Sequence, residues 1–449
     1  MKRAVAAALA ALLSALLAAC AGVPDRNHLA IPGAAREELL TPEGTTLAAK
    51  AEHFRREIDA RFLSPQGTLQ YVQRTGAEGF EYADLADVPI WGGALTGAEA
   101  LRFLATRDPA ARDATLGLVL GLDFLQEVTG VPGLLARNAV PRDAVPAGDG
   151  TIFFDAAPPH EEFLYRGDVS RDQYAGALFG YAMAFFALGD DPAVAAAVRA
   201  GAAPIADHLL ANGFRLRERG GKFTKHGDLR VHWGGIVPIG VNAGISLLAL
   251  KLAHLSTGEP RYAAAYRDLV ADGAAGALFW SKFQVFGKTN QNNDNMQYMA
   301  NLPLALLEED PALRRAYLDA LARTWEYVRL EGNSFFTFAT ASVLPVEARA
   351  IAEARDTLRR FPTWKSRLKV DVTDVAAFGR FPFTNRRGVP KADGAIPISY
   401  RAPSTYAWRD DPFALVSGGE PEGDTVFSGA DYLLAYWLGR ATGFVGAND

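Results

Sequence analysis

The stretch over residues 165–192, "YRGDVSRDQYAGALFGYAMAFFALGDDP", sets the pattern for the rest of the chain. Its centre places apolar side chains all around a helix, with Tyr174 and Phe185 on one stripe and Phe179 on the opposite side. A helix that is apolar on every side is buried on every side. The spacing therefore predicts a buried helix over 170–188, with a polar beginning and an acidic turn before a proline.

A turn of this kind, from an acidic residue into proline between two apolar segments, recurs at four places in the chain. In each copy an apolar segment ends, and a second helical segment begins at the proline. An acidic side chain can cap the new helix, and proline at its first position loses no hydrogen bond. Each turn is thus predicted to join two antiparallel helices closely. The four copies are Asp108-Pro109, Asp191-Pro192, Glu259-Pro260 and Asp310-Pro311.

Apolar periodicity predicts a chain made almost entirely of helices. Short links on one face leave long, polar and aromatic loops on the other, where function is expected. The fold class is therefore predicted as all-α, an (α/α)6 toroid of helical hairpins with long loops on one face. Helices are predicted near 47–63, 94–106, 110–128, 170–188, 192–211, 236–256, 260–278, 294–307, 311–329, 345–358 and 428–441, and strand-like loop pieces at 214–224 and 396–401.

The N-terminus has the pattern of an exported, lipid-anchored protein. "MKRAVAAALAALLSALLAACAG" places a positive start and a short apolar core before Cys20, the only cysteine in the chain. Leu17 to Cys20 resembles the cleavage signal of bacterial lipoproteins. We expect a signal peptide over 1–19, a lipidated tether over 20–46 and one toroid domain over 47–449. The expected location is the cell envelope, with the outer membrane favoured because Ala and Gly, rather than Asp, follow Cys20.

Composition excludes several classes of function. The formal net charge is −5 and no basic run occurs, so nucleic acid is not an expected partner. The chain has no Gly-x-Ser-x-Gly motif and no phosphate-binding loop. Its histidines lack a recognisable metal-ligand spacing. We therefore expect no cofactor and no metal.

Six segments resemble the six-hairpin glycosidase-like superfamily, particularly its uncharacterised bacterial members. The resemblance covers most of residues 85–440 and implies a toroid that processes or binds a glycan. Relatives with this fold include glycoside hydrolases, polysaccharide lyases and sugar epimerases, so the fold does not choose a reaction. The segments are "DVPIWG" (87–92), "LQEVTGVPGLLAR" (125–137), "GDVSRDQYAG" (167–176), "GKFTKHGD" (221–228), "NNDNMQYMANLPLALL" (292–307) and "DYLLAYWLGR" (431–440).

The polar start of the 170–188 helix is the first candidate site. Ser170 and Gln173 have the spacing of a capping box, and Asp172 suits the positive end of the helix dipole. Capping does not explain Arg166, Asp168 or Arg171. Asp168 and Asp172 are candidates to share a substrate hydroxyl or a proton, which would raise the pKa of one of them. Capping and catalysis both remain open for this segment.

The second candidate is the loop over 217–235, which follows a Gly-Gly turn. An imidazole can act as a base near neutral pH, and an indole offers a face to a sugar ring. The residues concerned are Thr224, His226, Asp228, His232 and Trp233.

The third candidate is the amide-rich run before the helix near 294–307. Asn292, Asn293 and Asp294 either cap that helix or bind sugar hydroxyls. Calcium would need more carboxylates than this run supplies.

The fourth candidate set consists of aromatic and basic residues whose spacing does not follow a helix. The loop over 378–413 is longer than a connector requires, and its aromatic content argues against disorder. It is either functional or a cover over the ring mouth. The residues singled out are Trp91 and Arg137 outside the loop and Arg386, Arg387, Lys391 and Arg401 within it, the last four for an acidic sugar.

Three functions remain open at this point. A glycoside hydrolase would use paired carboxylates, Asp168 or Asp172 with Asp228 or Asp294. A polysaccharide lyase would use a base such as His226 or Tyr174 with an arginine. A surface lipoprotein would bind a glycan or a protein without turnover.

Overall fold

A computed structural model describes residues 44–75, 79–83, 86–145, 153–233, 237–280, 290–384, 388–401, 404–418 and 424–449. The predicted signal peptide and Cys20 lie outside these residues.

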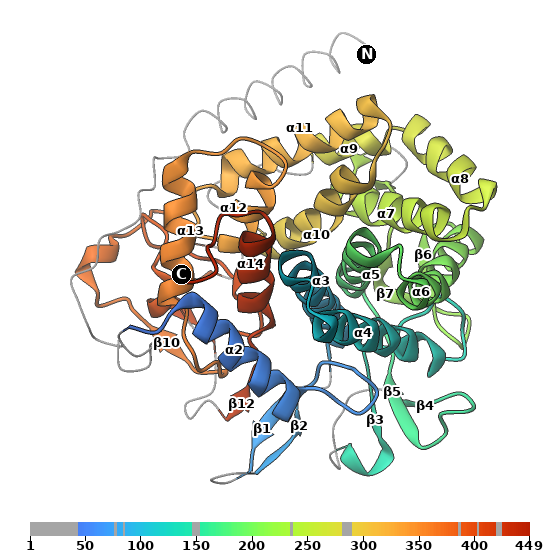
Figure 1. The fold of residues 1–449 in the computed structure, drawn as a ribbon, viewed down its shortest axis with the longest axis horizontal. Coiled ribbons are helices and arrows are strands. Elements are labelled where there is room, and N and C mark those ends of the chain that lie inside the picture. Colours follow the sequence, from blue (N-terminus) through green and yellow to red (C-terminus); the bar gives the residue numbers. More distant parts are fainter. Residues whose placement is uncertain are drawn as a thin grey trace.

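Six helices form an inner ring (Figure 1). Each contacts the next in chain order, and the last contacts the first, so the ring is closed. The predicted (α/α)6 toroid is confirmed. The inner helices are α3 (Val88–Thr106), α5 (Arg171–Leu188), α7 (Gly240–Thr257), α10 (Gln291–Leu307), α12 (Ser334–Ala341) and α14 (Ala430–Ala441).

Each inner helix packs against an outer partner. The sixth hairpin joins the two ends of the chain: the Tyr432 hydroxyl donates to the Leu47 carbonyl at 2.9 Å, and Ala48 N donates to Asp449 O at 3.2 Å. The outer helices are α4 (Pro109–Glu127), α6 (Pro192–Ala211), α8 (Pro260–Ala271) with α9 (Ala274–Phe279), α11 (Pro311–Val328), α13 (Ala348–Arg360) and α2 (Leu47–Glu57), which continues as a π-helical turn, η2 (Ile58–Phe62).

The predicted acidic turns link inner helices to outer ones. The carboxylates of Asp108, Asp191 and Asp310 accept hydrogen bonds from backbone N–H groups in the first turns of α4, α6 and α11. Glu259 makes no such side-chain bond before α8. These short turns follow the C-terminal ends of the inner helices, so most of the long connections enter at the N-terminal ends.

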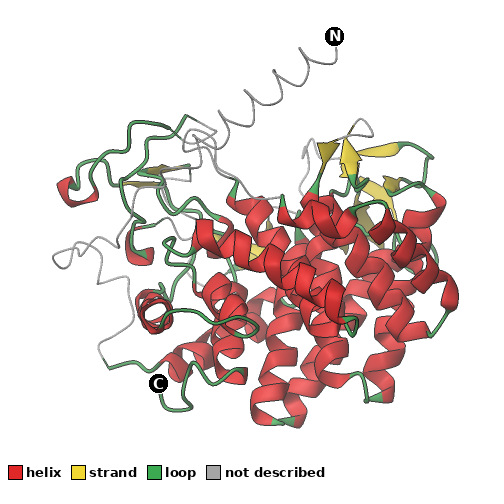
Figure 2. Cartoon of the chain, turned by 90° about the horizontal axis from the view of Figure 1, so that it is seen from above, coloured by secondary structure: helices red, strands yellow, loops and turns green. Residues whose placement is uncertain are grey.

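Those connections carry short antiparallel strands. Figure 2 shows them gathered on one side of the helices. The pairs are β1 (Tyr71–Arg74) with β2 (Phe80–Ala83) and β12 (Thr425–Val426), β5 (Phe163–Arg166) with β3 (Asn138–Pro141) and β4 (Phe153–Asp155), β6 (Arg215–Arg217) with β7 (Phe223–Asp228), β8 (His232–Trp233) with β9 (Val237–Pro238), and β10 (Val370–Asp371) with β11 (Val416–Ser417).

The structure corrects three details of the predicted elements. The 260–278 helix is broken, because Gly273 adopts a φ of 90° between α8 and α9. The strand expected at 396–401 is instead a turn with a 3-10 helix over Ile398–Tyr400. The inner helix α12 was not predicted.

Among the described residues, one helix is long and apolar enough to cross a membrane by length and composition: α6, Pro192–Ala211. In the ring it is an outer helix that contacts α4, α5 and α7.

A buried carboxyl group lies where α4 meets α5 and α6. Asp123 is 7% exposed, and its Oδ1 accepts the Tyr181 hydroxyl at 2.7 Å. Burial raises the pKa of Asp123 to about 7, with a smaller contribution from the charge of Glu127. The folded protein therefore binds a proton at this site that the unfolded chain releases near pH 4.

This proton gives stability a predictable dependence on pH. The pKa of Asp123 is higher in the folded protein than in the unfolded chain. The stabilisation from the bound proton is therefore complete below about pH 4 and is lost as the pH rises through about 7. Between pH 5 and 8 we expect the free energy of unfolding to fall by about 2–3 kcal/mol through this group. Asp123→Asn keeps the hydrogen-bond acceptor and should flatten that fall in urea titrations. An unchanged slope in the variant would contradict the assignment.

Candidate functional site

The N-terminal ends of the inner helices, with the connections that enter them, form what we call the ring mouth. Its polar residues come from segments far apart in the sequence. Four acidic residues stand at or just before the starts of α3, α5, α10 and α14: Asp87, Asp172, Asp294 and Asp431. The ring mouth thus collects carboxylates beside the positive ends of the helix dipoles.

Asp87 is held by two donors at the start of α3. Arg137 Nη2 donates to its Oδ1 at 2.6 Å, and Gln173 Nε2 donates to the same oxygen at 2.8 Å. No group in the described residues donates to Oδ2. The backbone of Asp87 has a φ of 59°, a strained value for a residue other than glycine. One carboxylate is therefore fixed in orientation by three segments, with one oxygen available.

Four polar atoms on residues at the ring mouth have no hydrogen-bond partner among the described residues. Within the described chain, no partner bonds Gln173 Oε1, Arg137 Nε, Trp91 Nε1 or the Tyr406 hydroxyl, and all four atoms are buried. Buried polar atoms normally have a hydrogen-bond partner. The hydrogen-bonding capacity of these four atoms is therefore not used by the described residues.

Residues 404–411 lie across the mouth, and we call them the mouth cover. Tyr406 and Trp408 are fully buried, and the Trp408 Nε1 group donates to the Asp431 carbonyl at 2.7 Å. Asn333 Nδ2 donates to the Trp408 carbonyl at 2.9 Å. The cover is thus fastened to the starts of α12 and α14, in agreement with one of the two interpretations left open for the 378–413 loop.

The mouth cover brings a second carboxyl group to the site. Arg409 lies over the Trp91 ring, 4.8 Å from its centroid, and Asp410 follows it. The Ser404 hydroxyl donates to Asp410 Oδ2. Burial raises the pKa of Asp410, and the positive charges of Arg409 and Lys365 offset part of that rise. Asp410 is therefore a carboxyl group disposed to hold a proton.

Next to Gln173, the starts of α5 and α7 meet the 217–235 loop. Arg171 Nη1 donates to Asn242 Oδ1 at 2.9 Å, and Asn242 Nδ2 donates to the carbonyl groups of Asp228 and Arg230. Burial lowers the pKa of Arg171, and the charges of Asp172 and Asp228 oppose that effect. The structure thus brings Asp172 and Asp228 toward one guanidinium.

The capping box predicted for α5 is wrong. Ser170 makes no side-chain cap, and its hydroxyl instead donates to Asp172 Oδ1. Asp172 Oδ1 also accepts Gln173 N at 3.2 Å, and the Gln173 side chain turns to Asp87. Asp172 takes the capping role because its carboxylate is a better acceptor than the hydroxyl.

The predicted pairing of Asp168 with Asp172 is not formed. The Asp168 carboxylate accepts Lys225 N at 2.8 Å, and its own N–H donates to Glu218 Oε1 at 2.7 Å. Asp168 is exposed and holds the β6–β7 hairpin against the start of α5. These two hydrogen bonds explain the position of Asp168.

The remaining residues of the second candidate segment are spread out. Asp228 is half-exposed in a bidentate ion pair with Arg230, which lowers the pKa of Asp228 and makes it a poor acid. His226 is exposed on β7, whereas His232 lies 3.4 Å from the Asp272 carboxylate. Thr224 is buried on β7, and the Trp233 side chain lies outside the described residues.

The start of α10 lies inside the ring mouth, as predicted. Asp294 is 1% exposed, and Asn292 and Asn293 are partly buried. Burial raises the pKa of Tyr298, and the charges of Asp294 and Glu331 add to that rise. These acidic groups therefore lie close to Tyr298 on α10, a helix that also contacts the mouth cover.

Two predicted ligand-binding residues have other partners. Trp91 offers no open face to a sugar, because it is 1% exposed and stacks on Tyr406 at 4.4 Å. Arg401 donates to the carbonyl oxygens of Ile396 and Glu331 at 2.6 and 2.7 Å, so it is not directed at an acidic sugar. Burial lowers the pKa of Arg401 to about 10.

The other basic candidates differ in position. Arg166 lies half-buried on β5, beside the strand that follows Arg137. Lys391 is buried, 3.7 Å from an Asp411 carboxylate oxygen. Arg386 and Arg387 lie outside the described residues.

Asp87 and Asp410 were missed as site residues. A signal for Asp87 existed, since Asp87 and Pro89 open "DVPIWG" much as an acidic residue and proline open the outer helices. The helix was instead predicted to begin at 94. Asp410 lies in "WRDDP", where no periodicity indicates burial.

Fold and site together define an α/α toroid of six hairpins with a carboxylate-lined mouth. This confirms, at the level of the fold, the resemblance to the six-hairpin glycosidase-like superfamily. No protein-family model matches the sequence, and no curated protein matches it.

Solved structures that align with this chain share little sequence with it. A metagenome-derived glycoside hydrolase family 9 endoglucanase aligns with a TM-score of 0.43 and 14% identity over 89% of this chain and 80% of its own. A GH9 protein from Bacteroides ovatus aligns at 0.42 and 12%, over 89% and 83%. A GH76 alpha-mannanase from Bacteroides thetaiotaomicron aligns at 0.26 and 10%, over 89% and 96%.

Proposed function

We propose that this protein is a carbohydrate-active enzyme of the glycoside hydrolase type, which acts on a glycan bound at the ring mouth. The observation that carries the proposal is Asp87, fixed by Arg137 and Gln173 with one oxygen available. Arg137 Nε and Gln173 Oε1, on the two residues that hold Asp87, have no hydrogen-bond partner among the described residues, and as a donor and an acceptor they match the hydroxyl groups of a sugar.

Hydrolysis of a glycosidic bond needs one carboxyl group that donates a proton and one carboxylate that acts as base or nucleophile. Asp410 suits the first role, because burial raises its pKa. Asp87 suits the second, because it forms an ion pair with Arg137. Arg409 lies over the ring of Trp91, which is one helical turn after Asp87, and Asp410 follows Arg409 in the mouth cover. The proposal thus differs from the pairs considered from sequence, which combined Asp168 or Asp172 with Asp228 or Asp294.

Asp87→Asn and Asp410→Asn should each lower glycan turnover by about 10²–10⁴-fold with little change in binding. Each substitution keeps the shape of the side chain and removes its acid–base function. Turnover is measured as release of reducing ends from a panel of polysaccharides, and thermal unfolding checks the fold. Asp319→Asn, in an exposed ion pair on α11, is the matched control and should retain full activity.

Full activity in Asp87→Asn would refute the carboxylate mechanism. If the wild-type protein binds a glycan of the panel and turns over none, the non-catalytic binding protein is the better description.

The proposal places the protein in the cell envelope, anchored by lipid on Cys20. The support is the N-terminal sequence alone. Cys20→Ser should move the protein from the membrane fraction to the soluble fraction, and retention in the membrane would reject the anchor.

A further inference from the structure

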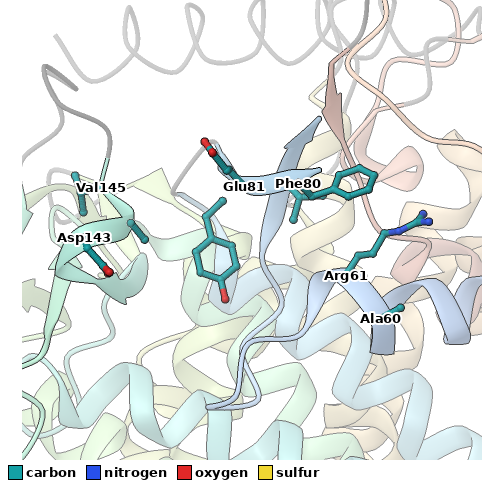
Figure 3. A pocket seen from close by; sticks show the side chains of 9 residues that line it. Ala60, Arg61, Phe80, Glu81, Asp143 and Val145 are labelled. Atoms are coloured by element: carbon teal, nitrogen blue, oxygen red, sulfur yellow. The ribbon is translucent and has the colours of Figure 1, made fainter. Parts of the chain in front are cut away.

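A groove of about 780 Å³ lies between the β1–β2 hairpin and the 3-10 turn η3 (Arg142–Ala144). Figure 3 shows Arg61 and Phe80 on one side of it and Asp143 and Val145 across from them. The volume is within the range of small-molecule binding sites, roughly 300–1,000 Å³.

Both walls of this groove lead directly to Asp87. β2 ends at Ala83, four residues before Asp87, a distance of at most roughly 14 Å along the chain. β3 begins at Asn138, immediately after Arg137, and runs into η3. The groove and the candidate site are therefore connected by the same two segments.

A buried amide pair fixes the two walls to each other. Gln70, just before β1, and Asn138, the first residue of β3, exchange two side-chain hydrogen bonds of 3.0 and 2.8 Å. Both residues are at most 1% exposed. The groove therefore keeps a constant position relative to Asp87.

The lining of the groove combines an aromatic ring with acidic groups. Tyr82 is half-buried, and no described residue bonds its hydroxyl. Burial raises the pKa of Tyr82, so the hydroxyl remains a donor at neutral pH. Glu81 and Asp143 are exposed carboxylates, whereas the positive charge of Arg61 is paired with Glu57 and lies over the Phe80 ring.

The negative charge of this lining favours neutral ligands over anionic ones. Glu81 and Asp143 form no ion pair with another described residue, and they repel uronate or sulfate groups because like charges brought together across an interface are unfavourable. The same carboxylates accept hydrogen bonds from sugar hydroxyls, and an amphipathic tyrosine ring can pack against a sugar face.

We propose that the groove binds further units of an uncharged glycan chain whose reacting unit lies at Asp87. The inference rests on the proposed function and deepens it: the substrate is an oligomer or polymer without acidic groups. It also disfavours the polysaccharide lyase, which would act on a uronate.

The test compares chain lengths and charges. Calorimetry on the full-length protein measures Kd for neutral oligosaccharides of two to six units from cellulose, mannan and xylan, and for oligogalacturonides of the same lengths. We expect affinity for one neutral series to rise by about tenfold or more from two units to six. Tyr82→Ala should abolish most of that gain and leave the disaccharide affinity within about twofold. Oligogalacturonides should bind the wild type weakly, and Glu81→Gln with Asp143→Asn should strengthen their binding.

Two control variants distinguish the loss of the Tyr82 aromatic ring from a general effect of substitution on the fold. Tyr82→Phe keeps the ring and should keep most of the length dependence. Phe186→Ala removes an exposed aromatic ring, 41% exposed, near the C-terminal end of α5 and should change nothing.

The outcomes are distinguishable. If short neutral oligosaccharides bind but Tyr82→Ala leaves the length dependence unchanged, or if oligogalacturonides bind more tightly than the neutral series, this inference fails and the proposed function stands. If none of the oligosaccharides binds at any length, both fail.

Discussion

Gly93→Ala is expected to lower the free energy of unfolding by about 3 kcal/mol or more, beyond most overpacking substitutions. Gly93 lies on α3, and a Cβ there would be 1.8 Å from the carbonyl oxygen of Gly176 on α5. A Cβ on Gly176 would in turn be 2.2 Å from the Ile90 Cα. Both obstacles are backbone atoms, so no side-chain rotation relieves them. The two helices would have to separate.

Gly117→Ala is the matched control, because Gly117 also lies inside a helix, α4, but no atom is within 4 Å of its added Cβ. There the reduced entropy of the unfolded chain should stabilise the protein by about 0.5–1 kcal/mol. Urea unfolding measures both variants. Similar effects for the two substitutions would contradict the close approach of α3 and α5.

The same helix contact positions the candidate site. Asp87 precedes α3 and Gln173 is in the first turn of α5, so the 2.8 Å hydrogen bond between them depends on the separation of these helices. The Gly93→Ala molecules that still fold should therefore turn over glycan more slowly than the wild type. Total activity should fall by a larger factor than the amount of folded protein does.

Long periodic segments made most of the fold predictable from sequence. The apolar side chains all around α5 indicated burial, and Tyr174, Phe179 and Tyr181 are fully buried, whereas Phe186 near its C-terminal end is 41% exposed. The acidic turns before proline indicated which helices form hairpins. The helix α12 was missed because its eight residues, "SFFTFATA", are too few to show a period of 3.6.

The candidate site was predictable only as a set of segments. The resemblance included 87–92, 125–137 and 167–176, which supply Asp87, Arg137 and Gln173. Their bonds join residues 50 and 86 positions apart, and local patterns carry no information on such contacts.

Neighbouring carboxylates also look alike in sequence. Asp168 and Asp172 differ in their hydrogen-bond partners: Asp168 accepts from Lys225 N, whereas Asp172 accepts from the Ser170 hydroxyl and from Gln173 N. The burial of Asp410 follows from an aperiodic loop that closes on the ring mouth, and only the folded chain shows it.

Asp431→Ala should cost about 3–5 kcal/mol, because it removes one partner of a buried ion pair. Asp431 and Lys365 are 0% and 1% exposed, and Lys365 Nζ also donates to the Ser428 carbonyl at 3.1 Å. Without the carboxylate, the ammonium group has only backbone carbonyls as partners. Burial already lowers the pKa of Lys365, so part of the cost will appear as release of its proton. Asp319→Ala, in an exposed pair on α11, should change stability by less than about 0.5 kcal/mol.

The larger consequence concerns the mouth cover. Asp431 Oδ2 accepts Ala407 N at 2.8 Å, so its loss removes a bond that holds Tyr406 against Trp91. Asp431→Ala should therefore change tryptophan fluorescence and increase proteolysis within 404–411 at urea concentrations too low to unfold the ring. Lys365→Met combined with Asp431→Leu removes both charges and should restore much of the stability but not the Ala407 bond. If the double variant also restores the wild-type fluorescence, the ion pair contributes stability alone and does not position the cover.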